Sequence, residues 1–100
     1  TIPEDNFIKQ ANYKQFMAYK QLTKLIREKT QRKETIETKV LNLYEASNPS
    51  LYYVYEVLGD YYAAIQQIDT AITYWQKALT MPIPKQAEKV RIQQKINKKQ

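Results

Sequence analysis

Apolar side chains recur along this chain at intervals of three and four residues, which is the spacing of one face of an α-helix. Two breaks interrupt the pattern, at Asn48-Pro49-Ser50 and at Met81-Pro82-Ile83-Pro84. The run Leu51–Tyr55 is aromatic and β-branched, which favours a strand, but it continues without a break into helical spacing. The pattern therefore predicts an all-α domain of about five helices.

Each predicted helix carries apolar positions on one side. Helices are expected over about 10–30 (after a short turn at 5–8), 34–46, 51–65 and 69–80, with a fifth starting near Pro84. The expected apolar positions are Tyr13, Phe16, Tyr19, Leu22, Leu25 and Ile26 in the first helix, Ile36, Val40, Leu43 and Tyr44 in the second, Leu51, Tyr55, Leu58, Tyr62 and Ile65 in the third, Ile68, Ala71, Ile72, Trp75, Ala78 and Leu79 in the fourth, and Ala87, Val90, Ile92 and Ile96 in the fifth. Asp69 is expected to cap the fourth helix, and Pro84 to lie in the first turn of the fifth.

The most specific pattern lies in residues 51–84. It reads Tyr55-x2-Leu58-Gly59-x2-Tyr62, followed by Ala71-x3-Trp75-x2-Ala78, and it contains the only glycine of the chain. This stretch resembles the tetratricopeptide repeat (TPR), a helix–turn–helix unit of 34 residues. The resemblance implies right-handed helical hairpins with these seven residues as the structural signature. Gly59 and Ala71 would then be small because two helices cross closely there, while Gln66 departs from the glycine that is common in the family's turn.

The resemblance also implies a division of the single domain 1–100. Residues 51–82 match the repeat well, 10–48 form a degenerate hairpin in which Lys24-Leu25 replace Leu-Gly, and 84–100 form a capping helix. Repeat arrays normally need about three units for stability. We therefore expect support from self-association or from a longer protein, of which this chain would be the C-terminal part.

A second resemblance concerns the layout of the whole chain. The opening Ile2-Pro3-x-Asp5-x-Phe7 and the run Tyr13-Lys14-Gln15-Phe16-x2-Tyr19-Lys20 look like the C-terminal helical extension of some bacterial acyltransferase-like N-terminal-nucleophile hydrolases, which are relatives of the penicillin acyltransferases. That resemblance implies a bacterial accessory domain. It carries over no catalytic residue, because that chemistry needs an N-terminal nucleophile.

Composition narrows the chemistry further. The chain has no cysteine and no histidine, which excludes disulfides, thiol nucleophiles and the commonest metal ligands and general base. We therefore expect no catalytic, metal-binding or cofactor-binding residues, and no enzymatic activity. The sequence has no apolar run long enough to span a membrane, so a soluble protein without a membrane partner is expected, and its location stays open.

Basic residues gather at both ends of the chain. Residues 1–40 hold nine Lys or Arg against five acids, 41–83 hold one against four, and 84–100 hold six against one, which gives the net charge of +6. The basic residues argue against nucleic acid as a partner, because 13 of the 16 are lysine and base recognition relies on arginine. The lysines at 95–99 are expected to be an ordinary basic helix end.

The candidate site lies on the third predicted helix. Tyr53, Glu56, Asp60 and Ala63 would line the concave groove in which repeat proteins hold peptides. The functional prediction is a groove that binds a protein or peptide segment carrying some positive charge. The alternative is that the first hairpin, or another part of the same chain, fills the groove. A clamp for a C-terminal carboxylate is excluded, because acids stand where cations are needed, and an acid–base pair of Glu56 and Asp60 is disfavoured without a third group.

Two other function classes remain open. The chain would otherwise be a structural domain that docks on a catalytic domain of its own protein or forms a homodimer, since Phe16, Leu22, Leu25 and Ile26 exceed what one partner helix covers. Nucleic-acid binding through the lysine-rich ends is a more remote alternative.

Overall fold

The computed structural model describes the backbone of residues 3–100 and the side chains of residues 16–100. It contains five α-helices in this range: α1 (Pro3–Arg32), α2 (Thr38–Ser47), α3 (Tyr52–Ala64), α4 (Ile68–Leu79) and α5 (Gln86–Lys99). The all-α prediction is confirmed. The first helix begins earlier than predicted, so the turn expected at 5–8 is part of α1.

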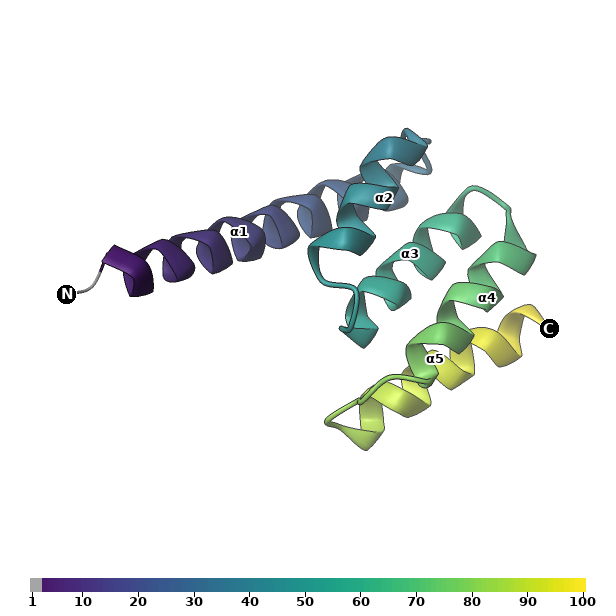
Figure 1. Ribbon diagram of the computed structural model, residues 1–100. Helices are drawn as coiled ribbons and strands as arrows, with labels where there is room; N and C mark the ends of the chain where they lie inside the picture. The colour runs from purple at the N-terminus through teal and green to yellow at the C-terminus, as the bar shows by residue number, and fades with distance from the viewer. Residues whose placement is uncertain (1–2) are drawn as a thin grey trace.

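The helices form two consecutive hairpins followed by a single helix. In Figure 1, α2 lies over the C-terminal part of α1, α4 packs beside α3, and α5 lies behind α4. The N-terminal part of α1 projects away from the other helices, and the molecule measures 56 × 30 × 17 Å. Its radius of gyration of 15.3 Å exceeds the roughly 13 Å of a compact chain of this length, because the N-terminal part of α1 lies outside the packed body. No helix of the described residues has the length and apolar character needed to cross a bilayer.

The central helix is α3, which is buried on most of its surface rather than along one stripe. Tyr52 and Tyr61, which the repeat pattern does not require, are buried together with the predicted Tyr55 and Leu58. The predicted Tyr62 is only partly buried and packs against the edge of the core. The burial of α3 on several sides results from its tertiary neighbours, because α1, α2 and α4 all contact it. A helix enclosed in this way needs apolar residues on several sides.

Both hairpins end their first helix in the same way. Lys33 and Gln66 have positive φ values of 57° and 69°. The next amides, of Glu34 and Gln67, donate to carbonyls five residues back, which is the Schellman pattern of a helix end. The two left-handed residues are 33 positions apart. Aligning the two turns pairs Leu58-Gly59 with Leu25-Ile26, one residue away from the Lys24-Leu25 of the predicted alignment.

The close helix crossing predicted at Gly59 is confirmed. A Cβ atom on Gly59 would lie 2.4 Å from Cδ1 and Nε1 of Trp75, far inside van der Waals contact. Ala71 and Ala78 of α4 are completely buried. Small residues on both helices therefore let α3 and α4 approach around the indole ring.

Several local predictions are wrong. Asp69 does not cap α4: Gln67 is its N-cap residue, no side chain caps it, and Asp69 lies in the first turn. Pro84 precedes α5, because Lys85 has an extended backbone and the helix begins at Gln86. Four positions of the expected apolar faces are exposed, with fractions of 54% for Phe16, 39% for Leu25, 56% for Leu43 and 43% for Val90; for Phe16 and Leu25 this agrees with the excess of apolar residues noted on the first helix. The side chain of Tyr13 lies outside the described residues.

Candidate interaction face

One face of the molecule, formed by α1, α3 and α5, carries three neighbouring hollows. Their volumes are about 350, 160 and 340 Å³, and Arg27 lines all three. The first follows α1, the second lies between α1 and α3, and the third lies between α1, α3 and α5. Their lining residues are Tyr19, Lys20, Thr23, Lys24, Arg27, Glu28 and Gln31 in the first, Arg27, Thr30, Gln31, Val57 and Asp60 in the second, and Arg27, Tyr53, Glu56, Asp60, Glu88, Arg91 and Lys95 in the third.

Glu56 is the one buried charged residue among the described side chains, with 2% of its surface exposed. Arg91 of α5 donates to both of its carboxylate oxygens, at 2.8 and 2.7 Å, and Lys95 donates at 2.7 Å. Burial by itself raises the pKa of Glu56, but the hydrogen bonds from Arg91 and Lys95 outweigh it and lower that pKa below its ordinary value. Glu56 is therefore an ionised group whose charge is matched from within the chain.

Asp60 lies one turn after Glu56 and shares a cation with it. Lys95 donates to both oxygens of Asp60, at 2.9 and 3.0 Å, and the indole Nε1 of Trp75 donates at 3.1 Å. Desolvation raises the pKa of Asp60 above its ordinary value despite the neighbouring Lys95. The carboxylate thus links α5 to the packed contact between α3 and α4.

The structure brings three of the four predicted groove residues together. Tyr53, Glu56 and Asp60 line the same hollow, and the Tyr53 hydroxyl accepts a hydrogen bond of 3.0 Å from Arg27. Ala63 is partly buried against the core and is not among the lining residues. Side chains of α5 already bond to both acids; Glu56 is buried, whereas the side chain of Asp60 is 37% exposed. The chain narrows this part of the groove without filling it, since a hollow of about 340 Å³ remains beside the two acids.

Sequence reasoning missed the three cations that define this face: Arg27, Arg91 and Lys95. For Arg91 and Lys95, the sequence does contain a signal in the spacing of their charges. Arg91 and Lys95 are four residues apart on one helix, as are Glu56 and Asp60, so both pairs lie on single helix faces. Matching these pairs would have predicted that the last helix docks its cations on the third.

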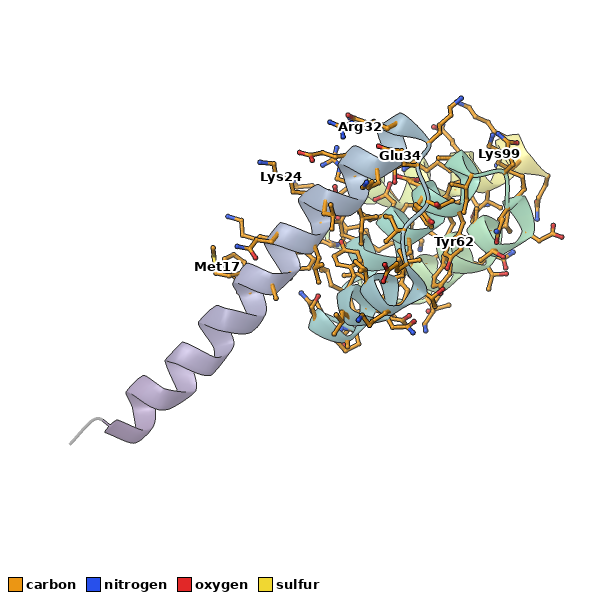
Figure 2. The ribbon with its side chains drawn as sticks, turned by 90° about the horizontal axis from the view of Figure 1, so that it is seen from above. Met17, Lys24, Arg32, Glu34, Tyr62 and Lys99 are labelled. Atoms are coloured by element: carbon orange, nitrogen blue, oxygen red, sulfur yellow. The ribbon has the colours of Figure 1, made fainter. Side chains whose placement is uncertain are left out.

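The α1 side of the face differs in its charge balance. Lys20, Lys24 and Arg27 line the first hollow together with Glu28, and none of the three takes part in an ion pair within the described residues. Lys24 projects from α1 on the side of the molecule opposite to Tyr62 (Figure 2). Among the residues that line the hollows, the cations without an ion pair are therefore those of α1.

The carboxylates of the described part of the chain are the candidates for metal ligands and for an acid–base pair. No group of three histidine, cysteine or carboxylate side chains is placed to hold a metal ion there. Glu56 and Asp60 share Lys95 and serve as its acceptors. Their chemistry is that of a structural ion-pair cluster.

Comparison of the chain with protein-family models, curated proteins and solved structures gives no match.

Proposed function

We propose that this chain is a non-catalytic protein-interaction module built from TPR-like hairpins, and that the face of α1, α3 and α5 receives a segment of another protein. The observation that carries the proposal is the series of three hollows around Arg27 on that face. Concave, largely preformed surfaces are where proteins hold ligands and peptides. The repeats would supply a rigid frame, and the hollows the contact surface.

Three features support the TPR-like assignment. The left-handed residues Lys33 and Gln66 end equivalent helices 33 residues apart. Prolines follow the second helix of each hairpin at 49 and 82, which is the same separation. Gly59 lies against Trp75 where the repeat pattern demands a small residue. A period of 33 is close to the 34 residues of the family, and α5 would be the cap of the array.

A second candidate function is favoured by a different observation. Phe16, Leu25 and Leu43 expose between 39% and 56% of their surface on the first hairpin. A first hairpin with exposed apolar residues would suit docking on a neighbouring domain of the same protein, or on a second copy. Sedimentation over a range of concentrations tests the homodimer, which predicts a mass that rises with concentration.

Binding at the hollow face is tested by NMR titration of the labelled chain with a panel of synthetic peptides of acidic, basic and neutral aromatic composition. We expect at least one peptide to shift the amides of Lys24, Arg27, Gln31 and Tyr53. Gln31→Trp would place an indole in the hollow and abolish that binding. Gln76→Trp, an equal change on the exposed side of α4, should leave it unchanged.

Peptides that shift only α2 and α4, or that bind the Gln31→Trp variant as tightly as the wild type, would contradict the proposal. The pair Tyr53→Ala and Glu56→Lys, which the sequence suggests, is a poor test. Glu56 is buried beside Arg91 and Lys95, so a lysine there would unfold the site rather than only block it.

A further inference from the structure

We propose that the segment received by this face is acidic, and that Lys20, Lys24 and Arg27 of α1 hold its carboxylates. This inference rests on the proposed function and adds the chemical class of the partner. It reverses the preference read from the sequence, in which Glu56 and Asp60 would attract a positively charged segment. The reversal follows from which charges of the face are already matched.

All three acids that line the α3 and α5 side of the face have a partner within the chain; Glu88 accepts a hydrogen bond of 2.5 Å from the Tyr52 hydroxyl. Two acids, Glu56 and Asp60, meet two cations, Arg91 and Lys95, in contacts of 2.7 to 3.0 Å. A partner's cation would have to displace hydrogen bonds that are charge-assisted and, at Glu56, buried, which costs far more than an exposed ion pair returns. This side therefore offers little to a basic segment.

The α1 side is left with unmatched positive charge. Lys20 and Lys24 have no ion-pair partner among the described residues; the recorded contact of Lys20 is with the Phe16 ring, 5.4 Å from Nζ to the centroid. Arg27 uses one donor on the Tyr53 hydroxyl and has further guanidinium donors. Against these three cations the hollow along α1 sets a single acid, Glu28. Positive charge thus dominates the hollow of about 350 Å³.

The spacing of these cations suits an extended segment that lies along α1. Lys20 and Lys24 are one helical turn apart, about 6 Å along the axis. Alternate side chains of an extended chain point to the same side and are about 6.6 Å apart. Acidic residues at alternate positions of a bound segment would therefore meet Lys20 and Lys24, with the next one near Arg27.

A protein segment fits this face better than a nucleic acid. A phosphate backbone carries a negative charge at every nucleotide, and it would pass Glu28 and Glu88, which also line the hollows. A peptide can place carboxylates at the cations alone and neutral residues elsewhere. The tyrosines Tyr19 and Tyr53 then offer contact area to its other side chains.

The test measures the binding of three labelled probes by fluorescence anisotropy. The probes are an oligoglutamate peptide, an oligolysine peptide and single-stranded oligo-deoxythymidine. We expect oligoglutamate to bind and salt to weaken it. Because an exposed ion pair contributes up to about fivefold in affinity, Lys20→Glu with Lys24→Glu should lower the affinity at least about tenfold. Lys85→Glu with Lys89→Glu changes the net charge equally at two exposed positions outside the hollows, the N-cap residue of α5 and a residue of its first turn. This control should change the affinity less than about twofold.

Each other outcome overturns the inference. Equal losses in the two double variants would mean attraction by net charge alone, and tighter binding of the oligonucleotide would assign the face to nucleic acid. If only basic or neutral peptides of the NMR panel shift Lys24 and Gln31, the acidic preference fails and the proposed function stands. If no peptide shifts them, both fail. Circular dichroism of each variant establishes that the helices are retained.

Discussion

Replacing Gly59 by alanine has two opposing effects on stability at the crossing of α3 and α4: a gain in helix propensity and a steric clash with Trp75. On an isolated helix the change is favourable by about 0.5–1 kcal/mol, because glycine loses more backbone entropy than alanine. In this structure the new methyl group would lie 2.4 Å from two atoms of the Trp75 ring and 2.9 Å from a third. Trp75 is 2% exposed, so the ring has no open space to enter. We expect the steric effect to win.

The size of the change in unfolding free energy follows from the displacement that the new methyl group requires. Restoring van der Waals contact requires a displacement of about 1 Å between α3 and the indole, and such overpacking costs roughly 1–3 kcal/mol. The same displacement weakens the 3.1 Å hydrogen bond from Trp75 to Asp60, at about 1 kcal/mol for a charged acceptor. After subtraction of the helix-propensity gain, Gly59→Ala should lower the free energy of unfolding by about 2 kcal/mol. That is a large share of the stability of a domain of this size.

Urea unfolding measures this change, followed by the fluorescence of Trp75, the only tryptophan of the chain, and by far-ultraviolet circular dichroism. The urea midpoint should fall while the slope stays constant. In a Trp75→Leu background, followed by circular dichroism, the obstacle is gone and Gly59→Ala should be neutral or stabilising. If Gly59→Ala stabilises the protein with Trp75 in place, the close contact does not limit the packing and the reasoning is refuted.

Two further predictions concern single side chains. Glu56→Gln should lower the unfolding free energy by about 2 kcal/mol at neutral pH. Because the pKa of Glu56 is lowered in the folded protein, this loss should shrink as the pH falls below about 4.5. Urea titrations measure it, and a difference from wild type that does not change with pH would contradict the prediction. Gln66 has a φ of 69°, which glycine adopts without strain, so Gln66→Gly should stabilise the protein by about 0.5–1 kcal/mol. The control Gln67→Gly, at a φ of −99°, should destabilise it. Equal effects of the two changes in thermal unfolding would show that the left-handed turn is not strained.

The parts of the fold that the sequence predicts well are those set by local spacing. The helices and their breaks follow from periodicity and proline, and the close contact at Gly59 follows from a glycine inside an apolar stripe. The sharing of one face by Tyr53, Glu56 and Asp60 follows from their separations of three and four residues. Only the contact at Gly59 involves a second helix, and that helix, α4, is the next one along the chain.

The predictions that fail depend on tertiary neighbours or on turn geometry. Leu43 is as apolar as Leu41, but only Leu41 faces the other helices and is buried. Asp69 is a good capping residue, yet the left-handed Gln66 reverses the chain within two residues and α4 starts at Ile68. The Asp69 carboxylate then lies inside the first turn, where it interacts favourably with the helix dipole.

The candidate site shows the same division. Periodicity places Glu56 and Asp60 on the face of α3, but their chemical meaning depends on α5, whose position no local pattern gives. With Arg91 and Lys95 docked, the two acids become internal acceptors and the cations of α1 become the unmatched charge of the face. Removing α5 would return the acids to solvent and make the same hollow attractive to cations. In the proposed interaction, the docking of α5, more than the residues of the predicted groove, would therefore set the class of partner.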